Sequence, residues 1–181
     1  MNRLVAIIGV PGTGKSTLVK ALMKRLGEWE RIKPWPLLDC EFNSETGLIV
    51  FGKYDEDETF PGTDKLSMAV QPNAIEYLKS TNNRRIIFEG DRLTTQSFLK
   101  SCLDNDIDLN IVALWVPEAT LQERYKARGS DQSKTFISGR ETKVDKIRSS
   151  FDFMSYVNEF KNETIEDQEK IIDYILNFLL K

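Results

Sequence analysis

The chain has 181 residues, of which 40% are hydrophobic and 29% charged, with a net charge of −3. These values are typical of one globular domain with a substantial core, and the acidic balance disfavours a general nucleic-acid binder. The chain contains no histidine, which excludes Ser-His-Asp and Cys-His catalysis and histidine zinc sites, so any general base is expected to be a carboxylate.

Targeting and redox signals are sparse. No apolar run approaches the roughly 18–20 residues that cross a bilayer, so no membrane association is expected. The first residues enter a predicted strand directly and leave no room for a signal peptide. Cys40 and Cys102 do not form a disulfide framework and are interpreted as small, partly buried cytosolic thiols. We therefore expect a cytoplasmic protein, whose oligomeric state the sequence does not specify.

The first predicted elements are a strand at 3–8, a glycine-rich loop at 9–16 and a helix that ends near Gly27. The loop matches G-x-x-x-x-G-K-[ST] between a strand and a helix, which is the context of a phosphate-binding loop. Glycines let backbone N–H groups turn toward a phosphate, and the helix N-terminus adds unpaired N–H groups. The predicted nucleotide-binding residues are Gly9, Pro11, Gly12, Thr13, Gly14, Lys15, Ser16 and Thr17.

Two residues of this loop have specific expected roles. Lys15 is expected to reach the β- and γ-phosphates of ATP, and the Ser16 hydroxyl is expected to hold Mg²⁺. The motif therefore predicts a nucleoside triphosphate site with ATP and Mg²⁺.

The next part of the chain contains an irregular segment and a hairpin. Residues 28–36 include two Trp and two Pro and are predicted to form a loop. Residues 37–43 and 48–54 are predicted to pair as a hairpin through Ser-Glu-Thr-Gly. Residues 55–64 are acidic and turn-rich, which indicates an exposed loop, and a helix is predicted over 72–80.

The second half alternates strands with helices. A strongly apolar strand begins at Arg84 and ends in Glu89–Arg92, and Thr94 or Thr95 is expected to cap a helix that runs to about Leu103. A third buried strand is predicted over 109–116.

The remaining elements are helical. A helix is predicted from Pro117 to about Arg128. Residues 129–139 show little periodicity, and helices are predicted over 140–150 and 165–180.

This alternation predicts a mainly parallel central sheet with helices on both faces. The expected fold is α/β, a three-layer α/β/α P-loop NTPase in one domain over 1–181. A helical lid is expected at about 119–148, and an inserted hairpin and acceptor region at about 37–72. Ligands of such sheets bind beyond the C-terminal ends of the strands, where the glycine-rich loop and residues 89–92 both lie.

The strand end at 89–92 carries the second set of candidate residues. Glu89 or Asp91 is expected to be the acidic partner of Mg²⁺, directly or through water, because P-loop proteins usually place this acid at a central strand end. Asp91-Arg92 resembles the Asp-Arg pair with which thymidylate and deoxynucleoside kinases bind their acceptor.

Residues 119–148 are distinctly basic. Arg124 and Arg128 are four positions apart and would share one helix face. Guanidinium groups suit the negative charge that develops on a moving phosphoryl group. A helix, a polar loop and a second helix are the layout of a kinase lid, which excludes water on closure and so suppresses wasteful hydrolysis.

The base that activates the acceptor remains open among four carboxylates, Asp39, Asp55, Asp64 and Asp91. Asp64 follows a turn on the expected acceptor side and is the first choice. The predicted acceptor-binding residues are Asp39, Asp55, Asp64, Lys65, Arg92, Arg140 and Lys143.

One further motif is rejected. Thr142–Asp145 matches the [NT]-K-x-D guanine-reading motif of GTPases, but it lies in a charged run rather than after a buried strand. The chain also lacks D-x-x-G, with which a GTPase senses the γ-phosphate.

These motifs together resemble the small P-loop kinases related to nucleoside and nucleotide kinases, and bacteriophage P-loop kinases more closely. Beyond the P-loop, the segments that carry this resemblance are 52–55, 60–72, 89–92 and 128–143. Some phage kinases of this kind phosphorylate the 5-hydroxymethyl group of a modified pyrimidine already in DNA. The resemblance implies such an acceptor, ATP and Mg²⁺, and the host-cell cytoplasm as the location.

Three hypotheses follow. The first is a kinase for a hydroxymethyl pyrimidine in DNA, which requires the base to be flipped out of the duplex and local phosphate contacts from the basic lid. The second is a kinase for a free nucleoside or nucleoside monophosphate. The third is a nucleotide-binding switch or assembly ATPase without an acceptor.

Overall fold

A seven-stranded sheet forms the centre of the molecule, in the order β2-β3-β4-β5-β1-β6-β7. The computed structural model describes residues 1–55, 61–127 and 134–181. The strands are β1 (Arg3–Ile8), β2 (Glu30–Trp35), β3 (Leu38–Asn43), β4 (Leu48–Phe51), β5 (Arg85–Glu89), β6 (Asp108–Trp115) and β7 (Val157–Lys161). The strands from β4 to β7 in this order run parallel, whereas β2, β3 and β4 are joined antiparallel. The mainly parallel sheet predicted from the sequence is confirmed.

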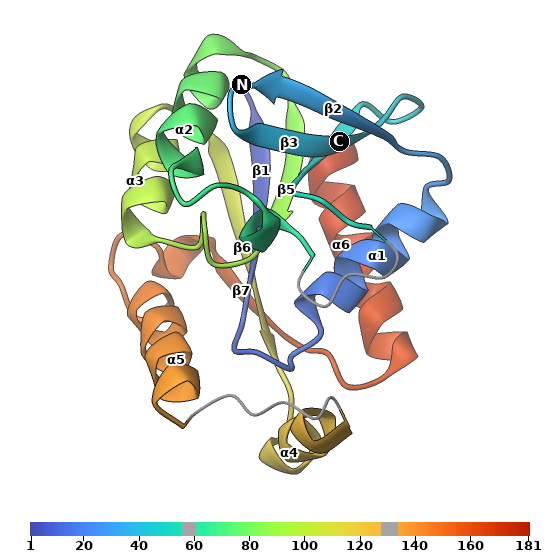
Figure 1. Ribbon diagram of the computed structural model, residues 1–181, viewed down its shortest axis with the longest axis vertical. Coiled ribbons are helices and arrows are strands. Elements are labelled where there is room, and N and C mark those ends of the chain that lie inside the picture. Colours follow the sequence, from blue (N-terminus) through green and yellow to red (C-terminus); the bar gives the residue numbers. More distant parts are fainter. Residues whose placement is uncertain (56–60, 128–133) are drawn as a thin grey trace.

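Helices cover both faces of this sheet (Figure 1). The helices are α1 (Lys15–Arg25), α2 (Val70–Ser80), α3 (Gln96–Asp104), α4 (Glu118–Ala127), α5 (Lys134–Arg148) and α6 (Ile165–Leu180), with short 3₁₀ helices η1 (Thr63–Lys65) and η2 (Met154–Tyr156). The helices α2, α3 and α5 lie on one side, and α1 and α6 on the other. The predicted three-layer α/β/α architecture is therefore confirmed.

Strand β1 divides the core in two because successive side chains of a strand point to opposite faces. Leu4, Ala6 and Ile8 pack toward α2 and α3, whereas Val5 and Ile7 pack toward α1 and α6. All five side chains are buried. A strand buried on both faces reads as a continuous apolar run, and this burial holds the P-loop at the C-terminal end of β1.

Two helix caps are local and follow from residue type. Thr95 is the N-cap of α3, and its hydroxyl accepts from the N–H of Phe98 at 3.1 Å. Thr94 instead donates to the carbonyl of Gly90. A capping box between Thr164 and Asp167 begins α6, and such boxes satisfy N–H groups that a helix leaves unpaired.

The predicted loop at 28–36 is wrong, because most of it forms β2. This strand lies at the edge of the sheet and pairs with β3 only. Pro34 lacks an N–H, which an edge strand tolerates, and the register shifts between Ile32 and Trp35. Pairing with β3 therefore outweighs local residue preferences.

Two further elements differ from the prediction. Residues 157–161 form β7, a short and partly exposed edge strand parallel to β6, which the sequence pattern did not indicate. Helix α5 begins at Lys134, six residues before the predicted start at Arg140, so the segment with little periodicity is helical from 134. Of the side chains of α5 that the structure describes, only Val144 and Ile147 join the core.

The acidic segment at 55–64 is only partly an exposed loop. Residues 56–60 lie outside the described residues, but Pro61, Gly62 and Thr63 are buried. Their burial places η1 against the end of β5.

Among the residues that the structure describes, no helix combines the length and the apolar character that a bilayer crossing requires.

Candidate active site

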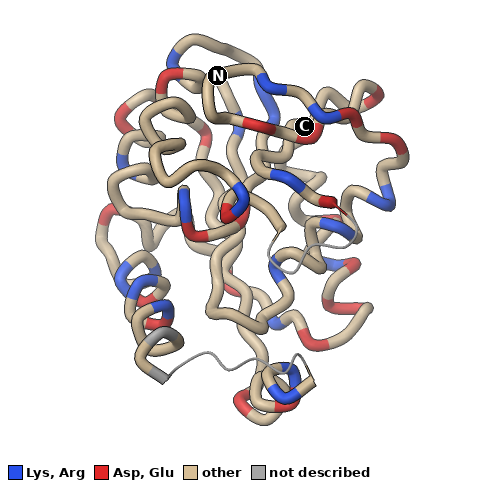
Figure 2. The backbone as a smooth tube through the Cα atoms, viewed as in Figure 1, with Lys and Arg blue, Asp and Glu red and all other residues tan. Residues whose placement is uncertain are grey.

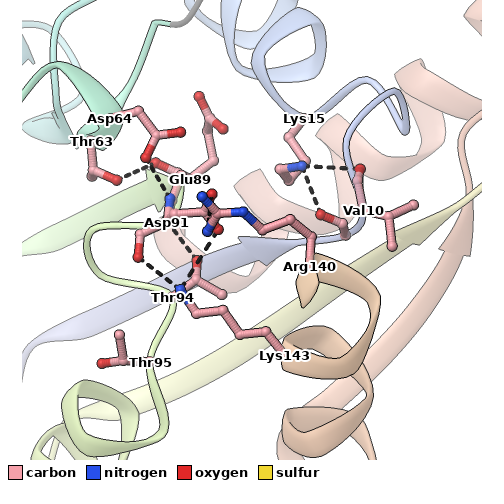
Figure 3. A network of polar contacts seen from close by, with 12 residues as sticks. Val10, Lys15, Thr63, Asp64, Glu89, Asp91, Thr94, Thr95, Arg140 and Lys143 are labelled. Carbon is pink, nitrogen blue, oxygen red and sulfur yellow. Dashed lines mark hydrogen bonds and ion pairs between the residues drawn. The ribbon is translucent and has the colours of Figure 1, made fainter. Parts of the chain in front are cut away.

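The candidate active site lies at the C-terminal ends of β1 and β5 (Figure 3). The P-loop follows β1, and Lys15 begins α1 directly after Gly14, which has a φ of 87°. The ammonium group of Lys15 donates to the carbonyls of Gly9 at 2.7 Å and Val10 at 3.2 Å. The lysine is thus held within its own loop, at the helix N-terminus where phosphate binds.

Ser16 and Glu89 form the candidate magnesium site. The Ser16 hydroxyl donates to Oε1 of Glu89 at 3.0 Å, and Glu89 is only 2% exposed at the end of β5. Hydroxyl and carboxylate oxygens are the hard ligands that Mg²⁺ prefers, so the two residues fit this ion. Within the described ranges no group of three or more His, Cys, Asp or Glu could hold a metal.

The surroundings of Glu89 raise the pKa of its carboxyl group. Burial raises the pKa of this carboxyl to about 7, while the Lys15 charge and the Ser16 hydrogen bond act in the opposite direction. The buried Tyr54 hydroxyl donates to the same Oε1 at 3.4 Å, and burial keeps the pKa of Tyr54 well above its ordinary value. Tyr54 therefore stays protonated and available as a donor to Glu89.

We expect the nucleotide-free protein in EDTA to lose stability as the pH rises from about 5 to 7.5. The unfolded Glu89 carboxyl ionises near 4.5, whereas the folded one stays protonated up to about 7. Since the unfolded state binds fewer protons in this interval, this contribution is complete below 4.5 and is lost as the pH passes 7. The loss should be on the order of 1–3 kcal/mol.

Urea unfolding at half-unit pH steps measures this loss. No histidine titrates in the same interval, because the chain has none. The variant Glu89→Gln should be nearly insensitive to pH over this range. Equal slopes for the wild type and Glu89→Gln would contradict the assignment.

The segment before α2 packs directly on the end of β5. The Thr63 hydroxyl donates to the Glu89 carbonyl at 2.8 Å, and Asp64 Oδ1 accepts from the N–H of Asp91 at 2.7 Å. Gly62 has a φ of 89°, and a Cβ atom there would collide with the Glu89 carboxylate. This close approach brings Asp64 beside the P-loop, so that Asp64 and Glu89 interact electrostatically.

Helix α5 reaches the same corner through two cations (Figure 3). Arg140 NH1 lies 2.5 Å from Asp91 Oδ2, and Lys143 Nζ donates to the Asp91 carbonyl at 3.0 Å. Lys143 also lies 3.7 Å from Asp91 Oδ1, and burial lowers the pKa of its ammonium group. The carboxylate of Asp91 is thus engaged by α5, whereas one oxygen of Asp64 is bound by a neutral N–H.

The other predicted acceptor residues lie in different surroundings. Asp39 pairs with Lys53 at 3.5 Å, and Asp55 pairs with Arg31 at 2.8 Å. Lys65 is exposed at the end of η1.

Arg92 is half-buried, and Glu41 is buried. Arg92 Nε is buried and has no hydrogen-bond partner among the residues that the structure describes. Buried Glu41 accepts from Arg31 at 2.6 Å and from the N–H of Tyr54 at 3.3 Å. Glu41 belongs to no sequence motif, and Tyr54 lies in the segment 52–55 that resembles phage kinases but had no predicted role of its own.

Arg124 lies on the outer side of the P-loop. Its guanidinium donates to the carbonyl of Gly12 at 3.0 Å and to those of Asn162 and Glu163 at 3.1 and 3.2 Å. Arg128 lies outside the described residues, so the expected pairing of these two arginines on a moving phosphoryl group stays a prediction.

The family model of P-loop Nucleotide Kinase3 matches residues 1–162. The chain is 33% identical to an adenylate kinase of Porphyromonas gingivalis, over 86% of this chain and 77% of that protein. It is 26% identical to a Methanosarcina mazei protein with a provisional adenylate kinase name, over 96% and 88% of the two chains.

A solved structure supports the fold alone. The gluconokinase of Sinorhizobium meliloti superposes with a TM-score of 0.50 at 13% identity, over 98% of this chain and 91% of that one.

Proposed function

Since this chain belongs to the P-loop nucleotide kinase family and is a phosphotransferase, we propose that it phosphorylates the 5-hydroxymethyl group of a modified pyrimidine in phage DNA. ATP is the donor, and Ser16 and Glu89 would hold Mg²⁺, which would neutralise charge on the phosphates. Lys15 and the P-loop N–H groups bind the β- and γ-phosphates.

The observation that carries this proposal is the meeting of four distant segments at one corner. They are the segments whose residues resemble phage kinases, around 54, 64, 91 and 140–143. Tyr54 contacts Glu89, Asp64 contacts the backbone of Asp91, and Arg140 and Lys143 contact Asp91. Four segments that are distant from one another in the sequence thus meet at one site next to the P-loop. Their meeting supports the view that they bind the same acceptor.

The chemistry requires a base for a primary alcohol. The hydroxymethyl oxygen attacks the γ-phosphorus, the bond from that phosphorus to the β–γ bridging oxygen breaks, and ADP leaves. Asp64 takes the hydroxyl proton. The hydrogen bond from the Asp91 N–H to Oδ1 fixes the orientation of this carboxylate, and its other oxygen, Oδ2, is the proton acceptor. Asp91 is less suited, since Arg140 and Lys143 compensate its charge.

Binding of DNA needs local positive charge on an acidic protein. Helix α5 carries five Lys or Arg and two acidic residues, and Figure 2 shows several cations along this helix. Two of them, Arg140 and Lys143, contact Asp91 at the site. Contacts from such a helix to DNA phosphates would place a flipped base near the γ-phosphate.

Transfer of labelled γ-phosphate from ATP tests the proposal. One acceptor set is duplex DNA with 5-hydroxymethyluracil or 5-hydroxymethylcytosine, with unmodified DNA as the control. The other set is a panel of nucleosides and nucleoside monophosphates. Label in modified DNA alone is the expected result, and label in free nucleotides alone overturns the proposed acceptor.

A second candidate is a kinase for a free nucleoside monophosphate. The relatives named adenylate kinase favour it, and the cations Arg140 and Lys143 could bind a phosphate group in place of Asp91. The nucleotide panel above detects this activity directly. ATP consumption without any phosphorylated acceptor would instead support the nucleotide switch or assembly ATPase.

A further inference from the structure

Three consecutive carbonyl groups on the outer side of the P-loop each accept a hydrogen bond from a side chain elsewhere in the chain. The pairs are Tyr125 Oη to Pro11 O at 2.8 Å, Arg124 NH1 to Gly12 O at 3.0 Å and Asn162 Nδ2 to Thr13 O at 2.8 Å. The donors come from α4 and from the residue that follows β7. We call Tyr125, Arg124 and Asn162 the outer clamp.

The clamp constrains the direction of the peptide groups. In a trans peptide the carbonyl of one residue and the N–H of the next lie in one plane and point opposite ways. Bonds that hold the carbonyls of 11, 12 and 13 to one side therefore set the N–H groups of 12 and 14 toward the other, while the N–H of Thr13 donates to the Val10 carbonyl at 3.3 Å. That side faces the interior of the loop, where phosphate binds.

Asn162 has little freedom to move away. It is 4% exposed, its N–H donates to the Trp115 carbonyl at 3.0 Å, and its own carbonyl accepts from Arg124. A Cβ atom on Gly14 would lie 2.7 Å from Asn162 Nδ2, so the side chain packs against the loop itself. Gly14, whose φ of 87° also favours glycine, thus leaves the space that this side chain occupies.

We infer that Tyr125 and Asn162, with Arg124 between them, are positioning residues that hold the P-loop peptides ready for the triphosphate. A loop that is already ordered loses less conformational entropy when the phosphates bind. The clamp acts on the donor side of the reaction, so it holds for any acceptor. It also assigns to Arg124 a role in the free enzyme that differs from contact with the moving phosphoryl group.

Calorimetric binding of tripolyphosphate, ATP and adenosine to the full chain tests this role. Tyr125→Phe keeps the ring but removes the donor, and Asn162→Asp keeps the shape but turns an oxygen toward the Thr13 carbonyl. A lost hydrogen bond of about 1 kcal/mol corresponds to about fivefold. We expect Tyr125→Phe to lower the affinity for tripolyphosphate and for ATP about fivefold, and Asn162→Asp to lower both affinities more. The affinity for adenosine should stay within about twofold of the wild type.

Matched controls separate positioning from loss of structure. Tyr156→Phe and Asn82→Asp change exposed or half-exposed residues outside the P-loop region, and their affinities should equal the wild type. In steady-state assays the clamp variants should raise the KM for ATP and leave the KM for the acceptor unchanged.

Two results would overturn the inference. One is an unchanged affinity of Tyr125→Phe for tripolyphosphate. The other is an equal loss of affinity for adenosine, which would show that the variant disturbs binding of the nucleoside and not of the phosphates. If Asn162→Asp does not fold, as judged by circular dichroism, the conservative variant Tyr125→Phe decides the question alone.

Discussion

Lys15→Ala is expected to lower kcat by at least about 10³-fold while leaving the free energy of unfolding within about 1 kcal/mol of the wild type. The ammonium group is the fixed positive charge of the P-loop and donates to the loop carbonyls of Gly9 and Val10. Its removal leaves the buried side chains of α1 in place, namely Leu18, Val19 and Leu22. The fold should therefore survive while the γ-phosphate loses its main counter-charge.

Lys24→Ala is the matched control, because Lys24 is exposed on the same helix. Lys24→Ala makes the same Lys-to-Ala change in α1 and removes the same charge, but it leaves the P-loop unchanged. Turnover of ATP and urea unfolding are measured on both variants. Near-normal activity in Lys15→Ala would contradict the assignment of the phosphate site.

Asp64→Asn is expected to lower kcat about 10²- to 10⁴-fold, which is the usual contribution of a general base. The amide oxygen can still accept from the N–H of Asp91, so the position of the residue is preserved and only the proton acceptor is lost. The affinity for ATP should change by less than about threefold, since Asp64 lies on the acceptor side. Single-turnover transfer from labelled ATP separates this chemical step from binding.

The control variants Asp39→Asn and Asp55→Asn make the same change at two other candidate carboxylates. Asp39 pairs with Lys53, and Asp55 with Arg31, so their loss should leave kcat within about threefold of the wild type. A larger effect from Asp91→Asn than from Asp64→Asn would move the base to Asp91. Loss of activity in either control would reopen the choice among the four carboxylates.

Tertiary pairing decided the elements that the sequence pattern missed. The edge strands β2 and β7 are short and partly exposed, and each is fixed by hydrogen bonds to one neighbour, β3 or β6. The partner of β7 lies far away in the chain, so no local pattern predicts this strand. Strand β2 pairs with β3, which follows it directly, but the two Trp and two Pro of residues 28–36 hide the strand pattern. The start of α5 at Lys134 was missed as well, since only Val144 and Ile147 among its described side chains enter the core.

Elements with a complete local signal were predicted from the sequence alone. The apolar runs of β1, β5 and β6 need no partner to be recognised, because strands buried on both faces read as continuous apolar segments. The P-loop motif, the Thr95 cap and the alternation of strands and helices are likewise written in neighbouring residues. They sufficed for the α/β P-loop fold and for the nucleotide-binding end of the sheet.

Which side chains meet at the site was decided only by the tertiary structure. The choice between Asp64 and Asp91 depends on which carboxylate α5 engages, and the role of Asn162 depends on a bond to Thr13, 149 positions away. Residue spacing carries no information on such contacts, because they arise from how the helices pack on the sheet. The sequence thus determined the donor site and its end of the sheet, and packing determined the neighbours of each acceptor-side residue.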